Sequence, residues 1–240
     1  ATDDGRPIVG ISRDEYTDTG TDATFTRTLA YPAANRNVGE ASLTVRQTET
    51  DARVPLAGWQ YNPEGTQITV TRPPGYDSGA IYEFIYPARN PTVMGIGLAA
   101  IRDVVSHLRY EMADEGGNPN PLTIGPRPAM ETAYAFGVSQ SGRVLRDLIH
   151  QGFNEDESHR IVFDGAFALL AGAKKSFTNY EFAQPGRTHR QHEEHLFPGD
   201  QVPFSYGVTL DRVSGRIDGL LSACGENGTF PNIMHIDSEN

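Results

Sequence analysis

The stretch YAFGVSQSGRVLRDLI, from Tyr134 to Ile149, passes from an apolar run straight into a helical pattern. Its first five residues favour a buried strand, and Val144, Leu145 and Leu148 recur at the spacing of one helix face. Two glycines and two serines occupy the corner between them. A strand that feeds a helix so abruptly needs small residues at the turn, and it limits the chain to folds in which a sheet packs against helices.

The corner has two interpretations, a plain tight turn and a nucleophile elbow. In an elbow the central serine takes a strained conformation, so the residues two before and two after it must be small. Gly137 and Ser141 flank Ser139 at these offsets, although the second position is more often glycine and here Gly142 follows it. The hydroxyl of Ser141 is a rival nucleophile, but it would lie one step into the helix. We therefore predict an elbow with Ser139 as the nucleophile.

An elbow also places the N-terminus of a helix beneath its serine. Unpaired N–H groups and the helix dipole stabilise an oxyanion there. The backbone N–H of Gln140 is the first expected donor. A second is expected from the loop that starts at Ala88 and Arg89, after a neighbouring strand.

The composition and the pattern of apolar residues change near residue 80. Residues 1–80 are rich in Thr, Gly, Asp and Pro and contain short runs typical of antiparallel strands. Residues 81–240 alternate apolar strands with amphipathic helices, which predicts an α/β fold with a mostly parallel sheet flanked by helices. The polar segment 174–230 has no strong periodicity and is expected to be a cap-like insertion. At 240 residues the chain is expected to form one domain, with 1–80 as its β-rich N-terminal part and 81–240 as its core.

Composition excludes several functions. A net charge of −11 argues against binding to the phosphates of nucleic acid. The longest apolar stretches are far shorter than the roughly 20 residues that span a bilayer, so no membrane contact is expected. Cys224 is the single cysteine, which rules out an intrachain disulfide, and it is expected to be a buried thiol.

Neither a metal nor a nucleotide cofactor is expected. The string HEEH at 192–195 separates its histidines by three positions, whereas the zinc motif that it resembles needs four. The string GIGLAA lies too far from the preceding strand for a dinucleotide-binding turn. His189, His192 and His195 are expected in the cap-like segment, either as hydrogen-bonded polar residues or lining the active site in contact with substrate.

Charged residues near the corner have simpler interpretations. Arg143 and Arg146 are expected to form a salt bridge with Asp103 on the preceding helix rather than to bind a substrate carboxylate. Asp164 precedes its strand, at the end of the sheet that carries no ligand, and Asp200 belongs to a PGD turn. Both aspartates are expected to be structural.

Three long motifs carry a family resemblance. They are FGVSQSGRVLRDLIHQGFNEDE, FDGAFALLAGA and FAQPGRTHRQHEEHLFPGDQVPFSY. From about Ile81 to its final strand the chain resembles a bacterial family of α/β-hydrolase-domain proteins. The resemblance implies the α/β-hydrolase fold, Ser139 as nucleophile and an esterase-like reaction. Family members often carry a cysteine pair near Cys224, and Phe230 stands at the second position here.

In this fold the triad follows the order serine, acid, histidine. The stretch PNIMHIDSEN matches the penultimate strand, so Asp237 and Glu239 are the candidate acids. No histidine follows them. We expect the sequence to be a fragment or a cleavage product, with the histidine supplied by a missing C-terminal part or by a second chain.

The sequence therefore predicts a serine hydrolase that cleaves a small-molecule carboxylic ester. Ser139 attacks the carbonyl, a histidine takes its proton, and a carboxylate orients that histidine. The alternative is a non-catalytic ligand-binding protein on the same fold, because a fold alone does not settle function. The two differ in whether a histidine reaches the Ser139 hydroxyl.

Overall fold

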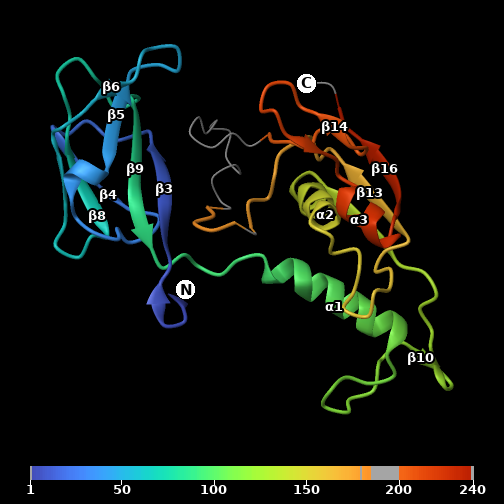
Figure 1. Ribbon diagram of the computed structural model, residues 1–240. Helices are drawn as coiled ribbons and strands as arrows, with labels where there is room; N and C mark the ends of the chain where they lie inside the picture. Colours follow the sequence, from blue (N-terminus) through green and yellow to red (C-terminus); the bar gives the residue numbers. More distant parts are fainter. Residues whose placement is uncertain (1, 179, 185–199, 239–240) are drawn as a thin grey trace. The chain divides into compact units, whose positions relative to one another are not determined.

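The computed structural model describes residues 2–178, 180–184 and 200–238. The chain divides into two compact units, coloured along the sequence in Figure 1. The first comprises Ala1–Met94 with Phe177–Pro198, and the second comprises Gly95–Ser176 with Gly199–Asn240.

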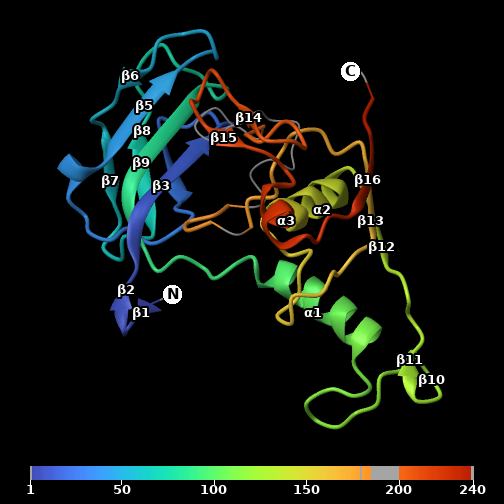
Figure 2. The same ribbon diagram turned by 45° about the vertical axis from the view of Figure 1, so that its right-hand side comes forward.

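The first unit consists of antiparallel sheets that face each other across a common core (Figure 2). The larger sheet has the strand order β3 (Val9–Tyr16), β9 (Ile81–Arg89), β5 (Ser42–Arg46), β6 (Val54–Pro55). The smaller sheet has the order β4 (Thr24–Thr28), β8 (Gln67–Thr71), β7 (Trp59–Tyr61). The short hairpin of β1 (Thr2–Asp3) and β2 (Arg6–Pro7) and the 3-10 helix η1 (Val38–Glu40) complete the unit.

Aromatic rings join the two sheets. Phe25 of β4 packs edge-on against Tyr82 of β9, with ring centroids 4.9 Å apart, and Trp59 of β7 packs against Phe84 of β9 at the same distance. These side chains come from alternate positions of their strands, as expected when one face of each sheet meets the other.

The arrangement of β9 corrects an expectation from the sequence. Its apolar run predicts a strand of the parallel sheet, but β9 pairs antiparallel with both β3 and β5. The strand is buried on both faces for another reason: Glu83, on the face opposite Phe84, forms ion pairs with Arg46 at 3.1 Å and Arg53 at 2.6 Å. An apolar run reports burial and not the direction of the neighbouring strands.

The second unit contains a three-stranded parallel sheet in the order β12 (Tyr134–Val138), β13 (Gly165–Leu169), β16 (Asn232–Ile236). Its helices are α1 (Ile96–Tyr110), α2 (Gln140–His150) and α3 (Ser222–Asn227). Two small hairpins are formed by β10 (Thr123–Ile124) with β11 (Arg127–Pro128), and by β14 (Thr209–Leu210) with β15 (Ile217–Asp218).

Helix α2 packs on β12 and β13 through Leu145, Leu148 and Ile149, which share a buried cluster with the free thiol of Cys224. On the opposite face of the sheet, apolar side chains such as Tyr134 are exposed. Only one of the described sheets is parallel, so the expected mostly parallel sheet with helices on both sides is not seen there. None of the helices in the described part of the chain is long and apolar enough to cross a membrane.

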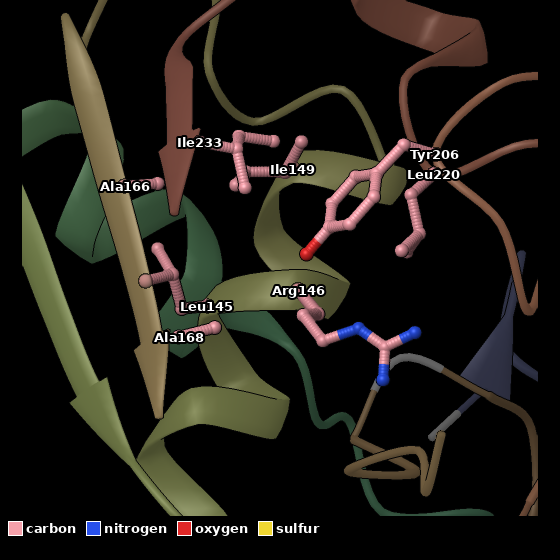
Figure 3. A pocket seen from close by; sticks show the side chains of 8 residues that line it. All are labelled: Leu145, Arg146, Ile149, Ala166, Ala168, Tyr206, Leu220 and Ile233. Carbon is pink, nitrogen blue, oxygen red and sulfur yellow. The ribbon is translucent and has the colours of Figure 1, made fainter. Parts of the chain in front are cut away.

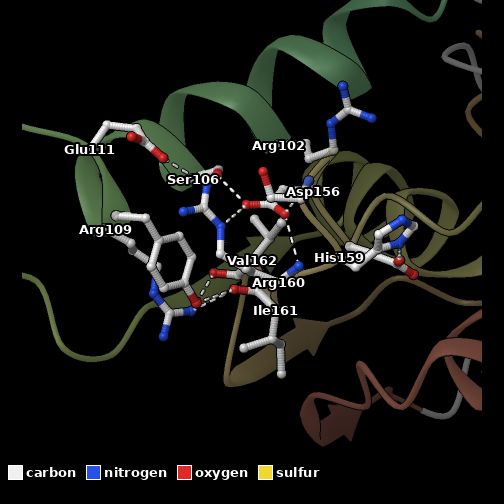
Figure 4. A network of polar contacts seen from close by, with 12 residues as sticks. Arg102, Ser106, Arg109, Glu111, Asp156, His159, Arg160, Ile161 and Val162 are labelled. Atoms are coloured by element: carbon white, nitrogen blue, oxygen red, sulfur yellow. Dashed lines mark hydrogen bonds and ion pairs between the residues drawn. The ribbon is translucent and has the colours of Figure 1, made fainter. Parts of the chain in front are cut away.

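A polar network ties α1 to the segment before β13 (Figure 4). Asp156 is its centre: it accepts a hydrogen bond from the Ser106 hydroxyl on α1 and pairs with Arg160 at 2.8 Å. Arg109 of α1 donates to the carbonyl of Val162 at 2.7 Å. These charges are largely buried but paired, so they fix the helix without leaving an isolated charge.

Candidate active site

Ser139 alone forms the corner between β12 and α2. Its backbone has φ 54° and ψ −115°, a conformation that non-glycine residues avoid. Two backbone hydrogen bonds hold it: the Ser139 N–H donates to the Leu169 carbonyl at 2.7 Å, and the Ser139 carbonyl accepts from Arg143 N–H at 3.1 Å. Strain of this kind, on the order of 1–3 kcal/mol, persists where the surrounding structure enforces it and is common at active sites.

The small residues at the corner are required by its geometry. A Cβ at Gly137 would lie 2.5 Å from the Ser141 carbonyl oxygen and 2.7 Å from the Gly142 nitrogen. A Cβ at Gly142 would lie 3.0 Å from the Ala171 Cβ and 3.1 Å from the Gly137 oxygen. On the helix side, the residue that packs closely against Ala171 and Gly137 is therefore Gly142 and not Ser141. This explains why a serine is tolerated at 141, where glycine is usual.

The two serines of the corner differ in what occupies their hydroxyls. The Ser141 hydroxyl donates to the Val138 carbonyl at 2.8 Å and accepts from the Val138 N–H at 2.8 Å. The Ser139 side chain forms no capping hydrogen bond with the helix and is exposed. Ser139 is thus the hydroxyl that is open to a ligand.

Ser139 lines a hollow of about 450 Å³ at the carboxyl ends of the parallel strands. This is where ligands bind in α/β proteins. The other lining residues come from the start of α2, from the loops after β13 and β16, and from Asp200: they are Arg143, Leu170, Ala171, Gly172, Lys174, Asp200, Asp237 and Ser238. Two cations and two carboxylates therefore share the hollow with the serine.

Asp237 is the first residue after β16. Its Oδ1 accepts a hydrogen bond from the Gly172 N–H at 3.1 Å, and its Oδ2 lies 2.9 Å from Nε2 of His235. Burial raises the pKa of Asp237, but the Gly172 N–H, His235 and Arg146 lower it by more, so the net pKa is below its usual value. Asp237 is therefore an ionised carboxylate held in place at the edge of the hollow.

The contact between His235 and Asp237 is one that the sequence analysis missed. His235 lies within β16, and its ring packs edge-on against Tyr206 with centroids 5.9 Å apart. The available signal was the spacing: residues two apart at the end of a strand point to the same face. The ring nitrogen is at ion-pair distance from the carboxylate, although the groups are not aligned as a hydrogen bond.

Other predicted site residues are only partly covered by the structure. Gln140 is the first residue of α2, as an oxyanion donor requires. Ala88 and Arg89 end β9 in the first unit. The prediction for Arg89 is wrong, because its backbone N–H donates to the Pro32 carbonyl at 2.9 Å, and the role of Ala88 stays a prediction. Glu239, His189, His192 and His195 lie outside the described residues. None of the histidines within the described ranges lines the hollow that contains Ser139.

The predicted salt bridge between the helices is wrong. Asp103 pairs with its own neighbour Arg102 at 2.6 Å, and Arg143 donates through Nε to the Ala171 carbonyl at 3.3 Å. Arg146 forms no ion pair with any residue that the structure describes. Residue spacing alone does not predict that Asp103 pairs with Arg102 and not with Arg143 or Arg146 of α2.

The two aspartates that were expected to be structural differ. Asp164 meets the expectation: it pairs with Arg109 at 3.0 Å and accepts from the Ala133 N–H at 2.8 Å before β13 begins. Asp200 instead lines the hollow with Ser139, which a local turn motif could not reveal. Within the described residues, no group of three or more His, Cys, Asp or Glu side chains is placed to hold a metal ion.

A family described as an alpha/beta hydrolase domain matches residues 33–238. The chain belongs to this alpha/beta hydrolase domain family. No curated protein and no solved structure matches it. Membership supports a hydrolase-type domain and leaves the substrate open.

Proposed function

We propose that this protein is a serine hydrolase that cleaves carboxylic esters through an acyl-enzyme on Ser139. The observation that carries the proposal is the strained backbone of an exposed serine between a parallel strand and a helix. This corner projects the hydroxyl into a hollow at the carboxyl ends of the strands. Membership of the alpha/beta hydrolase domain family supports it independently.

In the proposed reaction the Ser139 hydroxyl oxygen attacks the ester carbonyl while a base takes the hydroxyl proton. The backbone N–H of Gln140 stabilises the oxyanion. The alcohol then leaves with the proton, and water releases the acid from Ser139 by the same steps.

Asp237 is proposed as the acid that orients the base. It follows the serine in chain order, lines the same hollow, and has a lowered pKa that keeps it ionised near neutral pH. A fixed carboxylate stabilises the imidazolium that forms when a histidine accepts the serine proton. Glu239 is the second candidate.

The base is proposed to be a histidine from outside the described residues. None of the described histidines lines the hollow with Ser139. His150 lies 3.1 Å from Asp218, and His235 lies within β16, with its Nε2 2.9 Å from Asp237. His189, His192 and His195 are candidates, as is a histidine brought by further polypeptide.

Ester turnover tests the proposal. We expect p-nitrophenyl butyrate to be hydrolysed, and Ser139→Ala to lower kcat/KM by a factor on the order of a thousand or more. Ser141→Ala is the matched control, because it removes the neighbouring hydroxyl from the same corner, and it should retain most of the activity. Turnover that survives Ser139→Ala would contradict the proposal. Absence of turnover in the unaltered protein would favour a ligand-binding role.

A further inference from the structure

Two cations line the hollow beside Ser139, and neither has a counterion among the described residues. They are Arg143, one turn into α2, and Lys174, in the loop after β13, and both are half-buried. No carboxylate in the described part of the chain lies within ion-pair distance of either side chain. Charged groups placed in a hollow of this kind fix the orientation of a ligand, so these two are candidates for binding a negative charge.

The guanidinium of Arg143 is held in place by only one of its nitrogens. The Arg143 N–H donates to the Ser139 carbonyl at 3.1 Å, which places Arg143 one helical turn from the serine, about 6 Å along the axis. The Nε of Arg143 donates to the Ala171 carbonyl at 3.3 Å. No hydrogen bond within the described ranges uses its two terminal nitrogens. These nitrogens therefore remain available to bind a carboxylate as a pair.

Asp200 and Asp237, which also line the hollow, interact with other cations. Asp237 lies 2.9 Å from Nε2 of His235. Burial lowers the pKa of Arg146, and Asp237 and Asp200 are among the groups that partly offset this effect. Arg146 is not one of the lining residues, and Figure 3 shows its side chain beside Tyr206 among apolar residues. The carboxylates of the hollow thus leave its two lining cations for a ligand.

Leu170 gives the hollow an apolar wall. Its backbone has φ 53°, which non-glycine residues avoid, and its N–H donates to the Ile236 carbonyl at 2.7 Å. The residue is 43% exposed and lines the hollow with Ser139. A strained residue that presents a leucine side chain in a hollow suits contact with the methylene groups of a ligand.

We propose, on the basis of the esterase function proposed for Ser139, that the ester bears a second, ionised carboxylate, which Arg143 and Lys174 bind. The alkyl chain between the ester and the carboxylate contacts Leu170. It is a few methylene groups long, because Arg143 lies only about 6 Å from Ser139 along the axis of α2. A neutral ester still meets the nucleophile, but it binds more weakly because it lacks the charge-assisted hydrogen bonds.

Calorimetric titration of Ser139→Ala with monomethyl adipate tests the site without turnover. This probe carries an ester and a carboxylate separated by four methylene groups, and dimethyl adipate is its neutral control. We expect monomethyl adipate to bind at least about tenfold more tightly than dimethyl adipate. Equal affinity for the two esters, or no binding of monomethyl adipate, would overturn the proposed site.

Arg143→Gln and Lys174→Gln, each made in Ser139→Ala, test the two cations separately. Each removes a charge and keeps a polar side chain, so we expect the affinity for monomethyl adipate to fall about tenfold. Lys174 lies in a loop, so its variant keeps the test valid if Arg143→Gln fails to fold. Arg212→Gln is the matched control, because it removes an exposed arginine of the same unit that does not line the hollow. Full affinity in either lining variant, or an equal loss in Arg212→Gln, would refute the assignment.

Turnover by the unaltered protein distinguishes the carboxylate site from the esterase function. Hydrolysis of p-nitrophenyl butyrate without preferential binding of monomethyl adipate would refute the site and leave the esterase function intact. Preferential binding without hydrolysis of either ester would contradict the esterase function and support the site. The isomer 4-propanoyloxybutanoate carries its carboxylate in the alcohol part of the ester. Whichever isomer binds more tightly therefore shows whether the acyl or the alcohol part bears the charge.

Discussion

At the scale of single residues, Ser139 depends on its neighbours for the conformation that exposes it. Gly137 lets the chain return past the start of α2, and Gly142 lets the helix approach Ala171. Ser141 fills the space between them and binds the backbone of Val138. The residues beside Ser139 thus stabilise the tight turn and leave the Ser139 hydroxyl exposed.

We expect Gly137→Ala to lower the free energy of unfolding by about 3 kcal/mol, because the new Cβ would meet backbone atoms that cannot move aside. Urea unfolding measures it. Gly97→Ala is the matched control: this glycine of α1 has open space around it, and alanine favours the helix. That control should leave stability unchanged or raise it by up to about 1 kcal/mol. Equal effects at both positions would contradict the steric account of the corner.

Asp237→Asn tests which carboxylate serves the serine. The amide keeps the size of the side chain but cannot stabilise an imidazolium, so we expect kcat to fall on the order of a thousandfold. Glu239→Gln should have little effect on kcat. The reverse result, with loss of activity in Glu239→Gln alone, would transfer the role of the acid to Glu239.

At the scale of elements, a buried polar cluster holds α2 against the segments that follow β13 and precede α3. His150 at the end of α2 lies 3.1 Å from Asp218 of β15, and the Lys175 ammonium lies 3.4 Å from its other ring nitrogen. Burial and Lys175 lower the pKa of His150, and Asp218 and Asp147 only partly offset them. The folded protein therefore favours the neutral imidazole.

This cluster predicts a pH dependence of stability. The pKa of His150 is lower in the folded state than in the unfolded state, where it is about 6.5. As the pH falls below about 6.5, the unfolded state gains a proton that the folded state resists, so stability is lost. We expect the free energy of unfolding to fall less between pH 7 and pH 5 in His150→Gln than in the unaltered protein. Identical slopes in both proteins, measured by urea unfolding, would contradict it.

At the same scale, the elements differ in how far the sequence predicts them. The corner at Ser139 is predictable because its requirements are local: small residues at fixed offsets, an apolar run before and a helical pattern after. The pairing of β9 is not, because an apolar strand is compatible with either direction of its neighbours. Burial of Arg146 and the position of Asp200 in the hollow depend on segments distant in sequence, which no spacing rule specifies.

At the scale of the whole molecule, the chain has a separate hydrophobic core in each unit. Six of the fourteen buried residues of the first core are aromatic, whereas seven of the nine in the second are aliphatic. The family match begins at residue 33 and ends at residue 238, so it includes strands of both units. Strands β5 to β9 of the β-rich unit therefore lie within the family match and β1 to β4 precede it, whereas the proposed chemistry rests on the second unit.

The most direct test of the central claim is labelling with a fluorophosphonate, which reacts with activated serines, followed by peptide mapping of the adduct. The account predicts one adduct, on Ser139, and its loss in Ser139→Ala but not in Ser141→Ala. An adduct on Ser141, or no adduct on a folded protein, would contradict the assignment of Ser139 as the nucleophile.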